Sequence, residues 1–281
     1  MSKKTLIVLL TVVAVLAIAV SSAGAITDGE LDGDGHPHVV LLLMETESGQ
    51  NYRCSATMLS PTVVLTAGHC TSNYGYIEEE GDYVAMRVFT ESDVENGDNN
   101  YPDAGPNSIE AVEWYVHPLY ETEDPFYMHD VGIVILEEPG VVGLDVYGAL
   151  PEQDQLDDLP VPSGKKDKIL FTSVGYGQQI IFTDEDQWEM QSERIRMVAH
   201  PFLKQINVPG ITGDYSLWLS NNHSTGGTCY GDSGGPNFLE DTNIVAGVTS
   251  FGMNETCSGS GGVFRMDREN VLDFIYEHYT P

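Results

Sequence analysis

The sequence is short of positive charge. Its 281 residues include 12 lysines and arginines against 43 aspartates and glutamates, which gives a formal net charge of −31 at pH 7. A surface of this sign repels nucleic acids and anionic membranes, so we expect neither as a partner. The acidic residues are spread along the whole chain rather than gathered at one place. We therefore interpret them as promoting solubility, with attraction of basic proteins as the alternative.

Long apolar runs are missing except at the N-terminus. Lys3 and Lys4 precede the uncharged run Thr5–Val20, and Ala23-Gly24-Ala25 follows as a small-x-small cleavage site. This order is typical of a secretory signal peptide, with an uncleaved membrane anchor as the alternative, since a spanning helix needs about 20 residues. We expect residues 1–25 to be removed and the mature chain to be secreted, soluble and monomeric. Ten basic and 43 acidic residues then remain, a net charge of −33.

Cysteine is also scarce. Because export permits disulfides, the four cysteines allow three pairings. One close pair lies in each half of the chain, so we expect the bonds Cys54–Cys70 and Cys229–Cys257. No further cysteine or histidine lies at zinc-ligand spacing near Cys70, and we expect no metal there.

Strand-like segments dominate the chain after residue 25. They are short, rich in β-branched and aromatic residues, and separated by turn formers. Regularly spaced short strands predict a sandwich or barrel. The expected strands are Val39–Met44, Val63–Leu65, Tyr83–Phe89, Val131–Leu136, Ile169–Val174, Ile195–Val198, Ile244–Val248 and Gly262–Arg265.

A single helix is expected, at the C-terminal end. Asp267 is its expected N-cap, and an apolar face at helical spacing follows. That face consists of Val271, Leu272, Ile275, Tyr276 and Tyr279. The acidic, turn-rich segment Gln153–Lys168 lies near mid-chain, so we place a boundary at about 145–165.

The segment Gly231-Asp232-Ser233-Gly234-Gly235-Pro236 has the composition of a nucleophile turn. A serine hydroxyl is a poor nucleophile unless a base lies beside it. It also needs a tight turn whose N–H groups face the developing oxyanion, and flanking glycines permit such a turn. A glycine-rich surface turn is the structural alternative, but a six-residue pattern is more specific than a bare Ser-Gly-Gly.

Two other motifs supply a candidate base and a candidate acid. His69 follows a strand-like segment within Thr66-Ala67-Gly68-His69-Cys70, where a general base, a core histidine and a metal ligand are all conceivable. Asp130 immediately precedes an apolar strand. A carboxylate in apolar surroundings needs a partner, for which a histidine N–H is suitable, although a solvated aspartate at a strand start is the alternative.

Taken in the order His69, Asp130, Ser233, these motifs resemble the chymotrypsin/trypsin family of serine proteases. The 16-residue spacing of Cys54 and Cys70 is that of the family's histidine-loop disulfide. The resemblance implies an all-β fold of two six-stranded antiparallel β-barrels with a C-terminal α-helix. Residues 26–281 would form this domain, with barrels at about 26–150 and 151–281. The whole pattern looks like a secreted, prokaryotic-looking member.

The resemblance also implies residue roles. Ser233 attacks the scissile carbonyl, His69 takes and returns the proton, and Asp130 orients the imidazole. The N–H groups of Gly231 and Ser233 form the oxyanion hole. Asp232 pairs with the new α-amino group of the mature chain, which we expect at Ile26, directly after the leader.

Substrate binding is implied at a second set of positions. Ser250-Phe251-Gly252 is similar to the family's substrate-pairing strand, with Ser250 also supporting Asp130, and Gly262 is similar to a wall of the specificity pocket. Gly227 stands at the pocket floor, where trypsin-like members carry aspartate. We therefore expect protein or peptide substrates with a large apolar or aromatic side chain at P1, the residue before the scissile bond.

No cofactor is expected to be required. Two acidic groups could hold a structural calcium ion, but neither has EF-hand spacing, and solvated loops are the favoured interpretation. They are Glu78, Glu79, Glu80 and Asp82, and Asp28, Asp32 and Asp34. Two alternatives to an endopeptidase remain open. One is a catalytically inactive homologue acting as an extracellular binding module; the other is an enzyme for esters or for one dedicated protein.

Overall fold

The computed structural model describes residues 26–72, 81–120, 128–160, 168–184, 187–191, 193–209 and 212–281. The expected leader, residues 1–25, and the acidic residues 78–80 lie outside these ranges. Within the described residues, no helix is long and apolar enough to cross a membrane.

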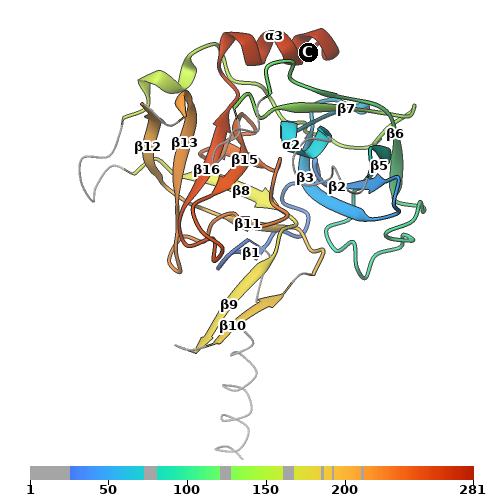
Figure 1. The fold of residues 1–281 in the computed structure, drawn as a ribbon, viewed down its shortest axis with the longest axis horizontal. Helices are drawn as coiled ribbons and strands as arrows, with labels where there is room; N and C mark the ends of the chain where they lie inside the picture. Colours follow the sequence, from blue (N-terminus) through green and yellow to red (C-terminus); the bar gives the residue numbers. More distant parts are fainter. Residues whose placement is uncertain are drawn as a thin grey trace, which may run out of the picture.

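The first half of the chain forms a closed six-stranded barrel with the strand order β2-β3-β4-β7-β6-β5 (Figure 1). Its strands are β2 (Val39–Thr46), β3 (Asn51–Met58), β4 (Val63–Thr66), β5 (Tyr83–Phe89), β6 (Ser108–Val116) and β7 (Gly132–Leu136). The apolar run at the start of β2 is buried on both faces. Such a run is typical of a strand that is covered on both sides.

The second half forms an eight-stranded sheet with the order β1-β11-β8-β14-β15-β16-β13-β12. Its strands are β1 (Glu30–Leu31), β8 (Phe171–Gly175), β11 (Met197–Ala199), β12 (Leu203–Val208), β13 (Gly213–Asn221), β14 (Pro236–Leu239), β15 (Val245–Gly252) and β16 (Gly259–Arg265). A separate hairpin, β9 (Gln179–Asp184) and β10 (Gln187–Gln191), extends from this half (Figure 1). The all-β prediction is confirmed, with a closed first barrel. The second sheet differs in strand number, partly because the N-terminal β1 pairs with β11.

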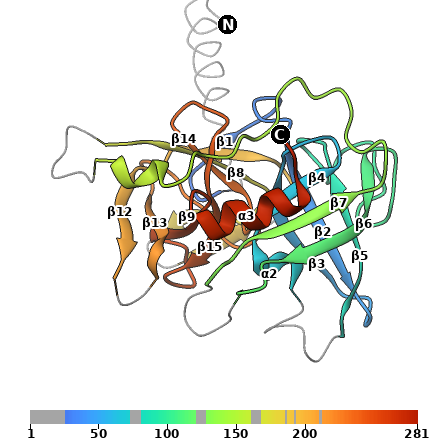
Figure 2. The same cartoon turned by 90° about the horizontal axis from the view of Figure 1, so that it is seen from above.

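Within the described ranges, the helical segments are α2 (Gly68–Thr71), the 3₁₀ turn η1 (Gln155–Asp158) and α3 (Glu269–His278). Figure 2 shows α3 lying over the body of the molecule. Phe274 and Ile275 enter the core cluster that contains the barrel strands, and His278 stacks on Tyr115 of β6 at 4.0 Å between ring centroids. The C-terminal helix therefore packs against the first barrel, although it follows the second sheet in sequence.

Two details of the expected helix are wrong. Asp267 does not cap it, because Arg268 occupies the N-cap position and the Asp267 carboxylate is buried in an ion pair with Arg265 at 2.7 Å. The buried arginine requires that carboxylate more than the helix end does. Tyr276 is 45% exposed rather than part of the apolar face, whereas Phe274 is buried there.

A second buried ion pair connects the N-terminal segment to both sheets. Arg196 and Asp32 each have side chains only 1% exposed, and Arg196 Nε lies 2.8 Å from Asp32 Oδ2. Arg196 also donates to the backbone carbonyls of Val39 in the barrel and Gly33 in the N-terminal segment. Burial opposes ionisation of Asp32, but hydrogen bonds from His36 and Arg196 outweigh it and lower the pKa of the carboxyl. Both charges are compensated, as a buried pair requires.

His38 is a buried titratable group near this pair. Its side chain stacks at a tilt on Phe238, with 5.4 Å between ring centroids. In the described part of the chain, neither ring nitrogen has a hydrogen-bond partner. Burial, followed by the nearby charges of His36 and Arg196, lowers the pKa of His38 to about 4. The ring is therefore neutral at physiological pH, and its protonation opposes folding.

We predict that His38 makes the protein less stable in acid. The folded-state pKa of about 4 lies below the ordinary 6.5, so the unfolded chain binds the proton more tightly between these values. Stability from this residue is present above pH 6.5 and is lost as the pH falls to 4, by about 3 kcal/mol. Urea unfolding at pH 7 and pH 4.5 should show a smaller acid loss in His38→Phe than in the wild type. His200→Asn, at an exposed histidine, should retain the wild-type loss; equal losses in all three chains would contradict this account.

Candidate active site

His69 and Asp130 come together where α2 packs against the start of β7. His69 Nδ1 lies 3.1 and 3.0 Å from the two carboxylate oxygens of Asp130, and the backbone N–H of His69 donates to Asp130 Oδ1 at 2.8 Å. The Asp130 side chain is fully buried, while that of His69 is 19% exposed. Such a pair orients an imidazole with one nitrogen held by the acid and the other ring nitrogen available for proton transfer.

Glycines allow α2 to approach this closely. A Cβ on Gly68 would lie 3.1 Å from the backbone nitrogen of Val131, and one on Gly132 would lie 2.3 Å from Thr71 Oγ1. Side chains at these two positions would push α2 away from β7, and His69 away from Asp130.

Ser250, on β15 of the second sheet, completes the surroundings of Asp130. Its hydroxyl donates to Asp130 Oδ2 at 2.5 Å. The aspartate of the barrel is thus bound to a strand of the other sheet, as expected from sequence. A carboxylate that accepts hydrogen bonds from several donors is held in one orientation.

Ser233 lies in a tight turn that packs against the histidine segment. Gly234 has φ +75°, and a Cβ there would lie 2.0 Å from Thr66 Oγ1 and 2.8 Å from the backbone nitrogen of Ala67. The residue after Ser233 therefore lies directly against the residues that precede α2. Only glycine fits, both for the left-handed backbone and for the space.

Ser55 is a residue of this site that the sequence reasoning missed. Its backbone N–H donates to the carbonyl of Ser233 at 2.8 Å. Its hydroxyl donates to the Gly231 carbonyl at 3.0 Å and accepts from the N–H of Tyr176 at 2.9 Å. One buried serine of β3 thus binds the turn on both sides of Asp232. Its position next to Cys54 was the only available signal, since a serine in a strand has no distinctive pattern.

The peptide groups around Ser233 leave two donors available. In the part of the chain that the structure describes, no acceptor is bonded to the N–H of Gly231 or of Ser233, whereas the N–H of Asp232 between them donates to the Cys229 carbonyl at 3.0 Å. Gly231 has φ +91°, a conformation that favours glycine. Two free N–H groups, that of the serine itself and that of the residue two before it, are what an oxyanion hole requires.

Asp232 is fully buried and binds backbone groups. Its carboxylate accepts from the N–H of Gly177 at 2.8 Å and from that of Cys229 at 2.9 Å. Burial raises the pKa of Asp232 to about 7, although both hydrogen bonds act against the shift. Ile26 is itself buried, beside Met197, with the unusual φ of +61°. The chain continues upstream of Ile26 here, so its α-amino ion pair with Asp232 stays a prediction.

The predicted pocket residues lie on neighbouring strands. Phe251 pairs with Gly262 across β15 and β16, and a Cβ on Gly262 would lie only 2.2 Å from the Phe251 ring. The ring therefore covers the glycine. Gly252 is open, with 3.7 Å to the nearest atom, while a Cβ on Gly227 would lie 2.3 Å from Asn221 Cγ. The Asn221 side chain adjoins the expected pocket floor, where it brings an amide rather than a charge.

Both predicted disulfides are present. Cys54 and Cys70 are bonded, as are Cys229 and Cys257. The sulfurs of the first bond and a ring nitrogen of His69 lie within 4.8 Å of one another. A disulfide sulfur carries no thiolate, and the thiolate is the metal ligand, so this grouping has the wrong chemistry for a metal site.

The acidic residues considered for calcium have other contacts where they are described. Asp32 is buried in its ion pair with Arg196, and Asp28 Oδ1 lies 2.7 Å from His223 Nδ1. Asp34 is exposed. Calcium binding at either acidic group stays a proposal.

Comparisons with known proteins agree with this geometry. A family model described as Trypsin matches residues 30–275. A trypsin from Saccharopolyspora erythraea is 28% identical over 233 residues, covering 82% of this chain and 87% of its own. The CLIP domain-containing serine protease B8 from Anopheles gambiae is 25% identical over 88% of this chain, which spans 62% of that protein's length. A solved structure of HL collagenase matches with a TM-score of 0.65 at 22% identity, covering 90% of this chain and 97% of that one.

The expectation of a prokaryotic-looking member is not supported. Although one relative is bacterial, the relatives are mostly animal proteins, from mosquito, guinea pig and crab among others.

We predict that Gly234→Ala separates the Ser233 turn from the histidine segment. The new methyl group would meet Thr66 Oγ1 at 2.0 Å, in addition to the strain of φ +75°. Gly143→Ala is a matched control, because Gly143 has φ +85° with nothing within 4 Å of the added Cβ. Left-handed strain costs about 1–2 kcal/mol in both chains, and overpacking adds about 1–3 kcal/mol in Gly234→Ala alone. Equal losses of unfolding free energy in urea would contradict the close contact.

Proposed function

Because this chain belongs to the trypsin family, we propose that it is a secreted serine endopeptidase that cleaves peptide bonds through an acyl-enzyme. The observation that carries the proposal is the bonding of His69 to a buried Asp130, which Ser250 also binds, beside a turn that presents Ser233. Family membership supports a serine protease; the triad roles and the covalent intermediate are our inference.

The chemistry follows from the arrangement. His69 Nδ1 is held by Asp130, so the other ring nitrogen, Nε2, acts as general base toward the Ser233 hydroxyl. The hydroxyl oxygen attacks the scissile carbonyl, and the N–H groups of Gly231 and Ser233 stabilise the oxyanion. His69 then returns the proton to the leaving amine. In the second half of the reaction, His69 takes a proton from a water molecule, which attacks the acyl carbonyl. The bond to Ser233 breaks, and the proton passes to the Ser233 oxygen.

We infer that activation requires only removal of the leader. Cleavage after Ala25 would create an α-amino group at Ile26, which is already buried near the second sheet. The buried Asp232 carboxylate binds two backbone N–H groups, and the charge of Arg53 lowers its pKa by less than burial raises it. A buried carboxylate is costly unless it is paired. The new ammonium group would supply a direct ion-pair partner and stabilise the turn that contains Ser233.

We propose that the substrate carries a large apolar or aromatic side chain at P1. Gly227 provides no carboxylate for a lysine or arginine substrate, and the adjoining Asn221 is neutral. The Phe251 ring, which contacts Trp218 edge-to-face at 6.0 Å, adds an apolar wall. Protein and peptide chains are the proposed substrates, and no cofactor takes part in these steps.

We predict that a fluorophosphonate modifies the secreted protein once, at Ser233. Intact-mass spectrometry should find a chain that starts at Ile26 and gains a single adduct, because only an activated serine hydroxyl attacks such a probe. Ser233→Ala should gain none, and Ser250→Ala should be labelled more slowly. An unlabelled chain that starts at Ile26 would contradict the proposed hydrolase and favour the binding-module alternative.

We predict opposite pH responses for the chain before and after cleavage at Ile26. With upstream residues attached, the Asp232 pKa of about 7 lies above the ordinary 3.8. The stability from this group is then fully present below pH 3.8 and is lost as the pH rises through 7. A free α-amino group, with an ordinary pKa near 8, favours the charged carboxylate and lowers its pKa.

Thermal unfolding at pH 5 and pH 7.5 tests this prediction. A chain that keeps Ala25 should lose more stability on raising the pH than the chain that begins at Ile26. Asp232→Asn should remove the difference between the two chains. Identical pH responses of the two unsubstituted chains would show that Asp232 does not pair with the α-amino group.

A further inference from the structure

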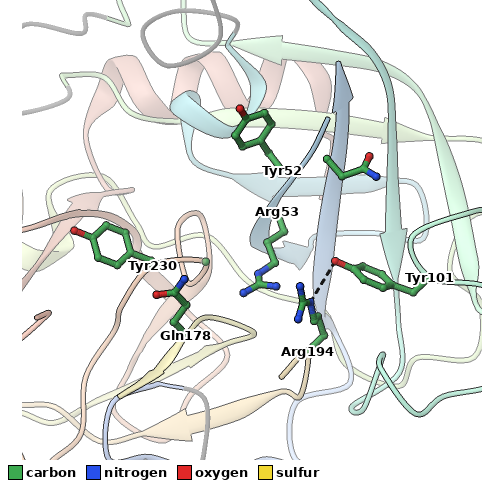
Figure 3. A pocket seen from close by; sticks show the side chains of 8 residues that line it. Tyr52, Arg53, Tyr101, Gln178, Arg194 and Tyr230 are labelled. Atoms are coloured by element: carbon green, nitrogen blue, oxygen red, sulfur yellow. Dashed lines mark hydrogen bonds between the residues drawn. The ribbon is translucent and has the colours of Figure 1, made fainter. Parts of the chain in front are cut away.

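The surroundings of Ser233 and of Asp130 differ in how they are filled. A polar cavity of about 280 Å³, whose lining includes Tyr52, lies beside Gly231, two residues before Ser233 (Figure 3). Asp130 instead comes directly after His129, which belongs to a row of closely packed aromatic rings. The centroids of neighbouring rings in this row lie 4.0–5.4 Å apart; the rings are those of His129, His117, Phe274, His278 and Tyr115. Packed rings therefore adjoin the proposed catalytic acid.

The buried His117 is fixed by hydrogen bonds to three other residues. Its backbone N–H donates to the Val131 carbonyl at 3.0 Å. Its Nδ1 accepts from the Leu119 N–H at 3.1 Å, so the proton is on Nε2, which donates to the Asn270 carbonyl of α3 at 3.2 Å. A neutral imidazole has one donor and one acceptor nitrogen, and burial, which lowers the pKa of His117, favours this neutral form. The ring is thereby held in one tautomer and one orientation.

Both chain neighbours of Asp130 are bound to His117. Val131, which follows Asp130, accepts the backbone N–H of His117. His129, which precedes Asp130, stacks on the His117 ring with 5.0 Å between centroids and 14° between ring planes. One fixed residue therefore holds the chain on each side of the carboxylate that lies 3.0 Å from His69 Nδ1.

His129 has an unfavourable backbone conformation. Its φ is +52°, in the left-handed region that residues other than glycine seldom adopt. Such strain persists only where the surroundings impose it, and it is concentrated at functional sites. The His129 ring is held on two sides, because besides stacking on His117 it packs at a tilt against Tyr215 and Phe264 of the second sheet, with centroids at 5.1 and 6.4 Å. These ring contacts account for the strained conformation of the residue before Asp130.

We propose that His117 and His129 are positioning residues of the active site, whose stacked rings hold the Asp130 carboxylate in place against His69. The inference rests on the proposed endopeptidase function and adds two residues to those that serve it. Both histidines act through Asp130 and take no proton from the substrate. Because His117 is bound to Asn270, the C-terminal helix α3 also supports the catalytic acid. The placement matters, since a displacement of about 1 Å can reduce a catalytic rate about 100-fold.

The first test removes the His129 ring without adding strain. His129→Gly relieves the left-handed backbone, so a loss of activity comes from the missing ring. On a peptide chosen from the casein fragments made by the secreted, leader-free wild type, kcat should fall about tenfold or more. KM should stay within about twofold, because Asp130 acts in the reaction rather than in substrate binding. Glu240→Gly is the matched control, since the exposed Glu240 has a φ of +51°, and it should keep the wild-type kcat and KM.

A conservative variant and a spectroscopic signal distinguish positioning from stability. His129→Phe keeps a ring on His117 and should retain kcat within about threefold. His129→Asn tolerates the left-handed backbone but has no ring, so it should lose activity as His129→Gly does. The proton on His69 Nδ1, which faces Asp130, gives a proton NMR resonance that reports the bond between them. This resonance should keep its wild-type position in His129→Phe and move in His129→Gly and His129→Asn.

The outcomes are separable from those for the proposed function. If the wild type is labelled at Ser233 by a fluorophosphonate and the two ringless variants keep its kcat, the positioning role is wrong and the endopeptidase stands. A loss that only matches the unfolded fraction of each variant, with the His69 resonance unmoved, also overturns the positioning role. His129→Asn carries the test where His129→Gly does not fold. If the wild type is neither labelled nor cleaves casein, the proposed function fails, and the positioning role fails with it.

Discussion

The candidate triad depends on two adjacent residues of β3. Cys54 is bonded to Cys70, which follows His69, and Ser55 hydrogen-bonds the backbone on both sides of Asp232. The barrel that supplies the histidine is thereby connected to the turn that supplies the serine. Catalytic groups must be placed to within a fraction of an ångström, and loops alone seldom achieve this. Two neighbouring positions on one rigid strand provide a common reference for both groups.

Several of the few basic residues are used in buried ion pairs that stabilise the fold. Arg196 and Arg265 are buried and paired with Asp32 and Asp267, so part of the small basic complement maintains the fold. Asp32 was considered as a calcium ligand from the sequence, but in the structure its carboxylate is paired with Arg196.

Local sequence patterns predicted much of the fold and of the site. They could not predict contacts between residues that are far apart in the sequence. Tyr83–Phe89 was predicted as a strand with its observed bounds, because β-branched and aromatic residues alternate there between turns. β3 was missed, since Asn51–Met58 has few such residues and its stability comes from neighbours on both sides. The sequence predicts Asp267 as an N-cap, but its carboxylate instead binds Arg265, two residues earlier. Ser55 likewise acquires its role only from partners more than 100 residues away.

The most direct test of the account is turnover of casein by the secreted, leader-free protein, measured beside Ser233→Ala purified in the same way. The account predicts steady proteolysis by the wild type, with fragments that identify apolar or aromatic P1 residues, and no proteolysis above background by the variant. Equal activity in both preparations would place the chemistry elsewhere or in a contaminant. Absence of cleavage by a correctly folded chain that begins at Ile26 would contradict the endopeptidase itself.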